Sequence, residues 1–315
     1  MRENASTIRN PRKLGLAISR RQFSRLSGAS FLTATRVTAQ QRHLTAQQVL
    51  ERIQKNLGVP WQTDTLDGFK SGEPSTEVSG VATTAMATME VLSHAVREKT
   101  NLVVTLEPVF FGRMDGASTP AAAGRGMVGI TPDDPVLLAK KEFIQKNELV
   151  VFRFYDNWRS RRPDPFATGL AQIMGWTNYQ AGGNALQYEI PSITIGALAE
   201  GLATRLKARA GIRVVGDART RVRRIAILPG VSPLASTMKA LPDADLVLAG
   251  EVREWESVEY AQDAVAAGQN KGLIMLGRVV SEEPGMSVCA DWLRRLIPEA
   301  PVRWLPAGDP YWRPA

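Results

Sequence analysis

The sequence predicts an α/β protein, in which helices cover sheets of mainly parallel or mixed strands. Short apolar runs alternate with segments of helical periodicity almost throughout the chain, and residues 78–106 have the strand–helix–strand pattern of a βαβ unit. The 315 residues are enough for one large domain or two modest domains with a real core. No repeat at the periods typical of solenoids is visible.

Several elements have clear boundary signals. Thr45 and Gln48 form a capping box before an apolar stripe, and Gly58 follows the end of that helix. Asp134 and Pro135 suit the N-cap and the first position of a later helix. Taken in order, the expected elements are helix 45–57, strand 78–84, helix 86–99, strand 102–106, a loop over 112–134, helix 135–147, strand 149–154, helix 165–175, a connector over 177–187, helix 194–209, strand 221–228, helix 233–241, strand 245–249, helix 256–267, strand 272–276, helix 286–296 and strand 302–305.

The positive charge of the chain is concentrated at its start. The formal net charge is +8, and residues 1–39 carry +7 of it through eight basic residues and one acid. The body, residues 40–315, therefore carries only +1, which leaves a nucleic-acid partner little charge to bind. No apolar run reaches the roughly 18 residues of a membrane helix, so we expect no membrane association of the mature form.

Residues 1–39 resemble a twin-arginine export signal. Ser19–Leu26 contains a pair of arginines with an apolar residue two positions on, and a short apolar stretch follows. Val37–Ala39 then offers small residues where a signal peptidase would cut. We therefore expect a signal segment over 1–39, an α/β domain over 40–315 and a periplasmic location. A basic tail without a targeting role is the alternative.

The chain is poor in residues of metal and nucleophile chemistry. Cys289 is its only cysteine, which excludes an intrachain disulfide, and its helical surroundings predict a small packing residue. The only two histidines, His43 and His94, are expected to be surface or satisfied residues. Catalysis by an imidazole base, a Ser-His-Asp triad or a Cys-His pair therefore has no candidate.

One loop matches a nucleotide motif in letters only. Gly124–Gly129 fits the pattern G-x-G-x-x-G. That motif works between a strand and a helix whose N-terminus meets the pyrophosphate. Prolines precede and follow this loop, so neither element is expected and we assign no nucleotide binding to it.

Three short segments carry the functional signal: Thr105–Pro108, Tyr155–Arg159 and Gly277–Glu282. Each lies at or just beyond the end of an expected strand, where α/β sheets place their ligands. Leu228–Ser232 and Gly250–Glu256 have the same placement, and the glutamates that begin with Glu251 make this region rich in acids.

In this order, the five segments resemble the dinuclear metal-centre family known as GTP cyclohydrolase 1 type 2, or NIF-three-like, over about residues 45–300. Residues 64–72 and the closing Ser281–Met286 belong to the same pattern. The Glu-Pro pair that follows the first ligand strand, and Glu-Trp-Glu after Gly250, resemble an exported subgroup. The resemblance implies interlinked α/β layers with mainly parallel or mixed sheets. It also implies two divalent ions held by histidines and carboxylates, and a homo-oligomer that is hexameric in this family.

Most ligand positions that the resemblance implies hold other residues. Only Glu107 and Glu282 can bind a metal in their usual state, and Asp156 lies nearby and could contribute. Two permanent cations would stand in the metal shell, and each unit-charge pair at 4 Å is worth roughly 4 kcal/mol at an effective dielectric of 20. We therefore expect an ionic cluster and no bound metal. By position, the substituted ligands fall on Leu106, Tyr155, Arg159 and Arg278.

Three functions remain open. The first, which we favour together with the third, is a non-catalytic binding protein that keeps the fold and binds a small organic anion. The second is a hydrolase that uses Glu107, Asp156 and Glu282 around one zinc, manganese or iron ion. The third is a structural subunit that assembles with other copies. The residues expected to line the pocket, besides the substituted positions, are Trp158, Glu251 and Trp255.

Overall fold

The computed structural model describes residues 44–115, 130–182 and 186–314. The signal-like segment, His43 and the loop Gly124–Gly129 lie outside these residues. Residues 43–315 form a compact unit of their own. Within the described ranges, no helix is both long and apolar enough to cross a bilayer.

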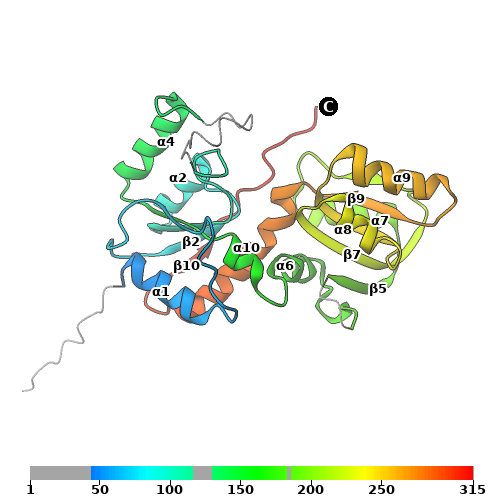
Figure 1. The fold of residues 1–315 in the computed structure, drawn as a ribbon, viewed down its shortest axis with the longest axis horizontal. Coiled ribbons are helices and arrows are strands. Elements are labelled where there is room, and N and C mark those ends of the chain that lie inside the picture. The colour runs from blue at the N-terminus through cyan, green and yellow to red at the C-terminus, as the bar shows by residue number, and fades with distance from the viewer. Residues whose placement is uncertain (1–43, 116–129, 183–185, 315) are drawn as a thin grey trace, which may run out of the picture. The chain divides into compact units, whose positions relative to one another are not determined.

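The first sheet has the strand order β1-β4-β3-β2-β10. Strands β2 (Val81–Thr84), β3 (Leu102–Thr105), β4 (Val150–Arg153) and β10 (Val302–Trp304) are parallel, and β1 (Gly68–Ser71) is an antiparallel edge. Helix α2 (Met89–Arg97) connects β2 to β3, which confirms the predicted βαβ unit (Figure 1).

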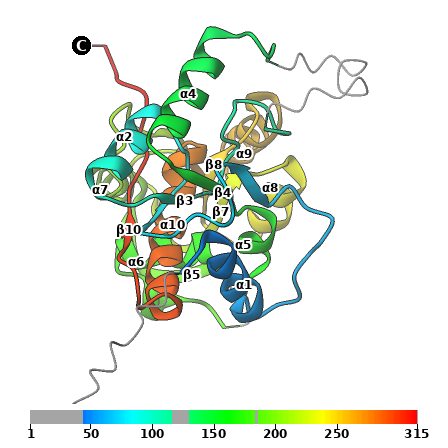
Figure 2. The same cartoon turned by 90° about the vertical axis from the view of Figure 1, so that its left-hand side faces the viewer.

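Successive side chains along these strands point to opposite faces of the sheet, and each face packs against a layer of helices. Helices α2 and α4 (Pro135–Lys146) cover one face, and α1 (Ala46–Asn56) and α10 (Arg278–Leu296) cover the other (Figure 2). Both faces are apolar because strands buried on two sides have no solvent-facing residues. The strand residues toward α1 and α10 are Val81, Leu102, Val104, Val150 and Phe152, and those toward α2 and α4 are Ala82, Val103 and Val151.

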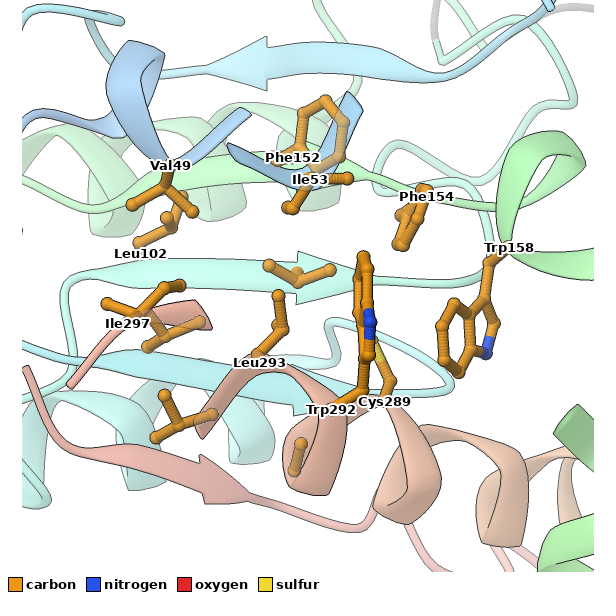
Figure 3. Packing of buried hydrophobic residues seen from close by; sticks show 14 of the residues in the cluster. Val49, Ile53, Leu102, Phe152, Phe154, Trp158, Cys289, Trp292, Leu293 and Ile297 are labelled. Atoms are coloured by element: carbon orange, nitrogen blue, oxygen red, sulfur yellow. The ribbon is translucent and has the colours of Figure 1, made fainter. Parts of the chain in front are cut away.

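Aromatic rings dominate the core between this sheet and α10. Trp158 lies 5.6 Å from Phe154 and 5.4 Å from Trp292 between ring centroids (Figure 3). Cys289 is fully buried in the same cluster, and burial raises the pKa of its thiol well above the usual value. The prediction that Cys289 packs as a small apolar residue is confirmed.

The second sheet has the strand order β5-β7-β8-β9-β6. Strands β7 (Arg221–Val231), β8 (Leu246–Glu251) and β9 (Gly272–Met275) are parallel, and β5 (Gln187–Thr194) and β6 (Arg213–Val215) are antiparallel edges. Both sheets are thus mixed, and the predicted α/β fold class is confirmed. The helices packed on this sheet are α6 (Pro165–Met174) and α7 (Ile195–Arg205) on one face, and α8 (Leu234–Ala240) and α9 (Glu259–Ala266) on the other.

Helix α10 packs against both sheets. It contacts β2 and β10 in the first sheet and β7 and β8 in the second. It also packs closely on α6, where Gly169 faces Pro284 and Gly285 faces Phe166 with no room for a Cβ atom. The first turn of α10 therefore starts where strands of both sheets end.

Several elements differ from the prediction. Strands β1, β5 and β6 were not predicted, because antiparallel edges are partly exposed and lack continuous apolar runs. Helix α10 begins at residue 278, and the prediction of 286 was wrong because Pro284 lies inside the helix. Shorter elements that were not predicted are α5 (Asp156–Ser160), a 3-10 turn η1 (Thr177–Tyr179) and a π-helical turn η2 (Glu254–Val258) ahead of α9.

Candidate functional site

Four charged side chains meet where the parallel strands end. Glu107 follows β3, and Arg159 lies in α5, directly after β4. Arg278 and Glu282 lie one turn apart at the start of α10, directly after β9. Carboxyl ends of parallel strands share one edge of a sheet, and α10 brings the edges of the two sheets together. We call these four residues the ionic cluster.

Arg278 bridges the two carboxylates of the ionic cluster. Its Nη2 atom lies 2.6 Å from Glu107 Oε1, and its Nε atom lies 3.6 Å from Glu282 Oε2. Arg159 Nη2 donates a hydrogen bond to the other oxygen of Glu282, Oε1. Two guanidinium groups therefore balance the formal charge of two carboxylates.

The two carboxylates of the ionic cluster are shielded from solvent, whereas the side chains of Arg159 and Arg278 are 29% and 34% exposed. Glu282 is fully buried, and Glu107 is 8% exposed. Burial raises the pKa of Glu282 to about 7, Glu107 adds to this rise, and Arg159 and Arg278 oppose it. Burial lowers the pKa of Arg278, but the charges of Glu107 and Glu282 outweigh it and the net shift is upward.

Aromatic rings hold the guanidinium group of Arg159. Its Cζ atom lies 4.7 Å from the ring centroid of Phe166 and 5.2 Å from that of Tyr155. A planar cation over aromatic faces is attracted by the ring quadrupole, and the attraction strengthens when water is excluded. Tyr155 thus supports the arginine from the position at which the family resemblance implies a histidine.

Glycines allow the second sheet to approach the ionic cluster. Gly230 in β7 has φ +76°, and a Cβ atom there would overlap Glu282 Oε1 and lie 2.6 Å from Arg159 Nη2. Gly250 in β8 packs as tightly on Gly230 and Ser281. Ser281 Oγ accepts from the Gly230 N–H at 3.0 Å and donates to the Arg278 carbonyl at 2.7 Å. Only residues without a side chain fit these two strand positions.

Two residues expected to line a pocket lie in the hydrophobic core. Leu106 and Trp158 are fully buried among the apolar side chains on the α10 face of the first sheet. Successive residues at a strand end point in opposite directions, so Glu107 reaches the ionic cluster while Leu106 packs inward. Trp158 lies on the core-facing side of α5, against Phe154.

Asp156 is engaged away from the ionic cluster. Its Oδ2 atom accepts hydrogen bonds from Thr65 Oγ1 at 2.6 Å and from the Leu66 N–H at 3.2 Å. Asp67 in turn accepts from the backbone N–H groups of Tyr155, Asp156 and Asn157 and so holds the start of α5. Both aspartates therefore connect α5 to the segment before β1.

The remaining expected residues are spread over the surface. Glu251 is exposed at the end of β8 and lines a cavity that Arg278 also lines. Trp255 is 70% exposed in η2, with Arg253 Cζ 5.6 Å from its ring centroid. His94 lies on the partly exposed face of α2 beside Glu98. None of these three side chains contributes an ion pair to the ionic cluster.

Several contributors were not found from the sequence. Phe166 carries no charge pattern, and Gly230 and Ser281 were noted only as parts of strand-end segments. Glu283 is buried and accepts hydrogen bonds from Trp304 Nε1 at 2.8 Å and from the Ala307 N–H at 3.1 Å. Burial raises the pKa of Glu283 to about 7, and these hydrogen bonds oppose the rise. Its apolar neighbours in α10 were the only available signal of burial.

The donor set of the ionic cluster can be compared with what a dinuclear centre needs. Such a centre requires several imidazole or carboxylate ligands around each ion. Within the described ranges, no group of three or more His, Cys, Asp or Glu side chains is placed to hold a metal ion. Glu107 and Glu282 are both paired with arginines. These residues do not fit a dinuclear metal site.

Solved structures resemble this chain in fold. A Staphylococcus aureus hypothetical protein, SA1388, is 17% identical with a TM-score of 0.63, and the match covers 86% of this chain and 99% of that one. A protein named ybgI, of unknown function, is 17% identical with a TM-score of 0.63 over 85% of this chain and 100% of its own. A Bacillus cereus protein related to NIF3 is 12% identical with a TM-score of 0.61 over 84% and 97%.

Sequence comparison adds no closer relative. No protein-family model and no curated protein sequence matches the chain. At identities this low, the structural likeness establishes the fold and not the activity. The chain therefore has the α/β fold seen in NIF3-related proteins, which is the fold that the sequence resemblance implies.

Proposed function

We propose that this chain is a NIF-three-like protein in which the ionic cluster replaces the dinuclear metal centre, and that it works as a non-catalytic binding or assembly protein. One observation carries the proposal. Both carboxylates at the family's ligand positions are taken by guanidinium groups, Glu107 by Arg278 and Glu282 by Arg159.

The chemistry of arginine makes this exchange hard to reverse by metal binding. A guanidinium group does not lose its proton in proteins, so a divalent ion cannot gain a ligand by deprotonating it. An incoming ion would have to displace two cations from a shielded site or bind beside them. Binding beside the arginines would leave excess positive charge at two buried carboxylates, and displacing the arginines would break both ion pairs.

The competing function is a hydrolase with a reduced carboxylate site. It would need Glu107, Asp156 and Glu282 around one zinc, manganese or iron ion. The hydrogen bonds of Asp156 to Thr65 and Leu66 favour the non-catalytic function, because that carboxylate would have to leave both donors to reach an ion.

Metal content tests the proposal directly. The full chain is produced with added zinc, manganese or iron, and bound metal per chain is measured by elemental analysis. We expect trace metal in each case. One or two ions per chain, lost when Glu107→Gln and Glu282→Gln are introduced, would overturn the proposal.

A gain-of-metal variant strengthens this test. Arg159→His with Arg278→His removes both cations and adds two imidazoles beside Glu107 and Glu282. We expect this double variant to bind metal, whereas Arg219→His with Arg223→His, a surface control, stays metal-free. A folded double variant that binds no metal would show that the positional assignment of ligands is wrong.

We also propose that residues 1–39 direct the folded protein to the periplasm and that the mature chain forms a homo-oligomer, a hexamer by resemblance. Twin-arginine export carries folded proteins, which suits a chain that assembles before export. Replacing Arg20 and Arg21 by lysine should retain the protein in the cytoplasm.

Sedimentation analysis of the mature chain should give an oligomer, and a monomer at micromolar concentration would contradict the proposed assembly.

A further inference from the structure

A cavity of about 780 Å³ lies next to the ionic cluster and shares Arg278 with it. Its walls come from five separate segments: Met86 between β2 and α2, the end of β8, the junction of β9 with α10, the segment that leads into β6, and the C-terminal segment after β10. Glu107, Glu282 and Arg159 are not among its lining residues. The cavity therefore adjoins the ionic cluster and shares only Arg278 with it.

Positive charge predominates along the wall of this cavity. Three arginines line it, Arg213, Arg278 and Arg313, together with two acids, Glu251 and Asp309. Asp309 is 8% exposed, and its two oxygens accept backbone hydrogen bonds from Ala210 and Tyr311. Through these two hydrogen bonds, Asp309 fixes the C-terminal segment against residue 210.

Two of the arginines have charge available for a ligand. Arg313 forms no ion pair with any residue that the structure describes, and its Nη2 atom would lie 3.0 Å from a Cβ atom at Gly211. Gly211, with φ +77°, thus leaves the space that the guanidinium group occupies. Arg213 pairs with Glu254, but both side chains are more than two-thirds exposed, so water screens this pair.

The start of α10 adds backbone donors to the same wall. Gly277 is the N-cap, no side chain caps the helix, and its first turn contains no acid. Residues 276–280 line the cavity, so the first N–H groups of this 19-residue helix lie along it. Apolar groups of Met275, Val252 and Tyr311 complete the lining.

We propose that this cavity binds a small organic phosphate monoester. The three terminal oxygens of a phosphate can accept from arginine forks and backbone N–H groups together, which suits this wall better than it suits a single carboxylate. The apolar lining favours an organic group over a bare anion. The proposal deepens the binding function proposed above and rests on it, because Arg278 must stay a cation and not give way to a metal ligand.

Titration calorimetry of the metal-free full chain tests the site with phenyl phosphate, inorganic phosphate and succinate as probes. We expect phenyl phosphate to bind more tightly than the other two, and its affinity to fall as salt is raised. Arg313→Ala should weaken binding by about tenfold or more, the loss expected for a charged hydrogen-bond partner. Arg219→Ala, at an exposed residue that does not line the cavity, is the matched control and should leave binding unchanged.

The possible results separate this proposal from the preceding one. No detectable binding of phenyl phosphate at millimolar concentration overturns the site, as does an Arg313→Ala variant that binds like the control. Tighter binding of succinate overturns the assignment to phosphate. Arg313 lies in the exposed C-terminal segment, so its replacement does not threaten folding. Metal content is measured on the same samples, so a metal-loaded chain refutes the ionic cluster without deciding the anion titration.

Discussion

Replacing Arg159 by methionine should destabilise the protein by an amount that depends on pH. The substitution leaves the fully buried Glu282 with Glu107 as an anionic neighbour and with only the 3.6 Å contact to Arg278. The Arg159 side chain is 29% exposed, so its own desolvation is modest and the cost falls mainly on the abandoned carboxylate. Removing one partner of a buried ion pair costs about 3–5 kcal/mol.

The pKa of Glu282 determines when that full cost applies. Its folded-state pKa of about 7 is above its ordinary 4.5, so its contribution to stability is present below pH 4.5 and is lost as pH rises through 7. At pH 6 the carboxyl is mostly protonated, and losing Arg159 removes a hydrogen bond to a charged donor, about 1.5–3 kcal/mol. At pH 8.5 it is mostly ionised, and the loss should approach about 3–5 kcal/mol.

Urea unfolding followed by tryptophan fluorescence at the two pH values measures this difference. The surface variant Arg219→Met breaks the exposed pair with Asp217 and should show no measurable loss at either pH. Adding Glu282→Gln to Arg159→Met should recover part of the stability. It should also remove most of the difference between the losses at pH 6 and pH 8.5. The reasoning is refuted if Arg159→Met loses the same free energy at both pH values, or if it unfolds like the surface control.

Three further predictions concern the surroundings of the ionic cluster. Gly230→Ala should destabilise the protein by more than the about 1–3 kcal/mol of an unfavourable positive φ, because its Cβ atom also displaces Glu282. Gly58→Ala is the control, because Gly58 has φ +83° with open space around it. In the same urea assay it should show the backbone cost alone. The free energy of unfolding should fall between pH 5 and pH 8, because the pKa values of Glu282 and Glu283 are both raised from 4.5 to about 7 and their contributions are lost through that window. Glu283→Gln should reduce this slope and leave the part due to Glu282, and an unchanged slope would exclude Glu283 as a source. Trp158→Ala should lose about 3–5 kcal/mol by opening a core cavity, and a loss near 1 kcal/mol would show that this ring is not tightly packed.

The central strands could be predicted from the sequence, and the edge strands could not. Strands β3 and β8 are buried on both faces and appear as continuous apolar runs bounded by polar residues. Strand β5 contains Pro191 and alternates between buried and exposed positions, so no periodicity distinguishes it from a connector. Its pairing with β7 joins residues that lie 27 to 39 positions apart in the sequence, from Thr194 with Arg221 to Gln187 with Ala226. Such contacts leave no local signal.

The candidate site shows the same division. Glu107 and Arg159 could be placed together because each directly follows a parallel strand, and such ends share one edge of a sheet. Phe166 could not be placed there, because it reaches Arg159 from a helix that starts elsewhere along the chain. Arg313 reaches its cavity from the C-terminal segment, which has no periodic pattern at all. Local sequence therefore identified the residues near strand ends, and tertiary packing supplied the others.

The ionic cluster and the cavity should have separable roles, although the start of α10 contributes to both. Arg278 and Glu282 are four residues apart on α10, so one helical face presents both to the strand ends. The helix also packs on both sheets, and its ion pairs to Glu107 and Arg159 connect it to the first sheet. Loss of these ion pairs should lower the free energy of unfolding whether or not a ligand is bound. Loss of Arg313, which belongs to the cavity alone, should change binding and leave the free energy of unfolding as it was.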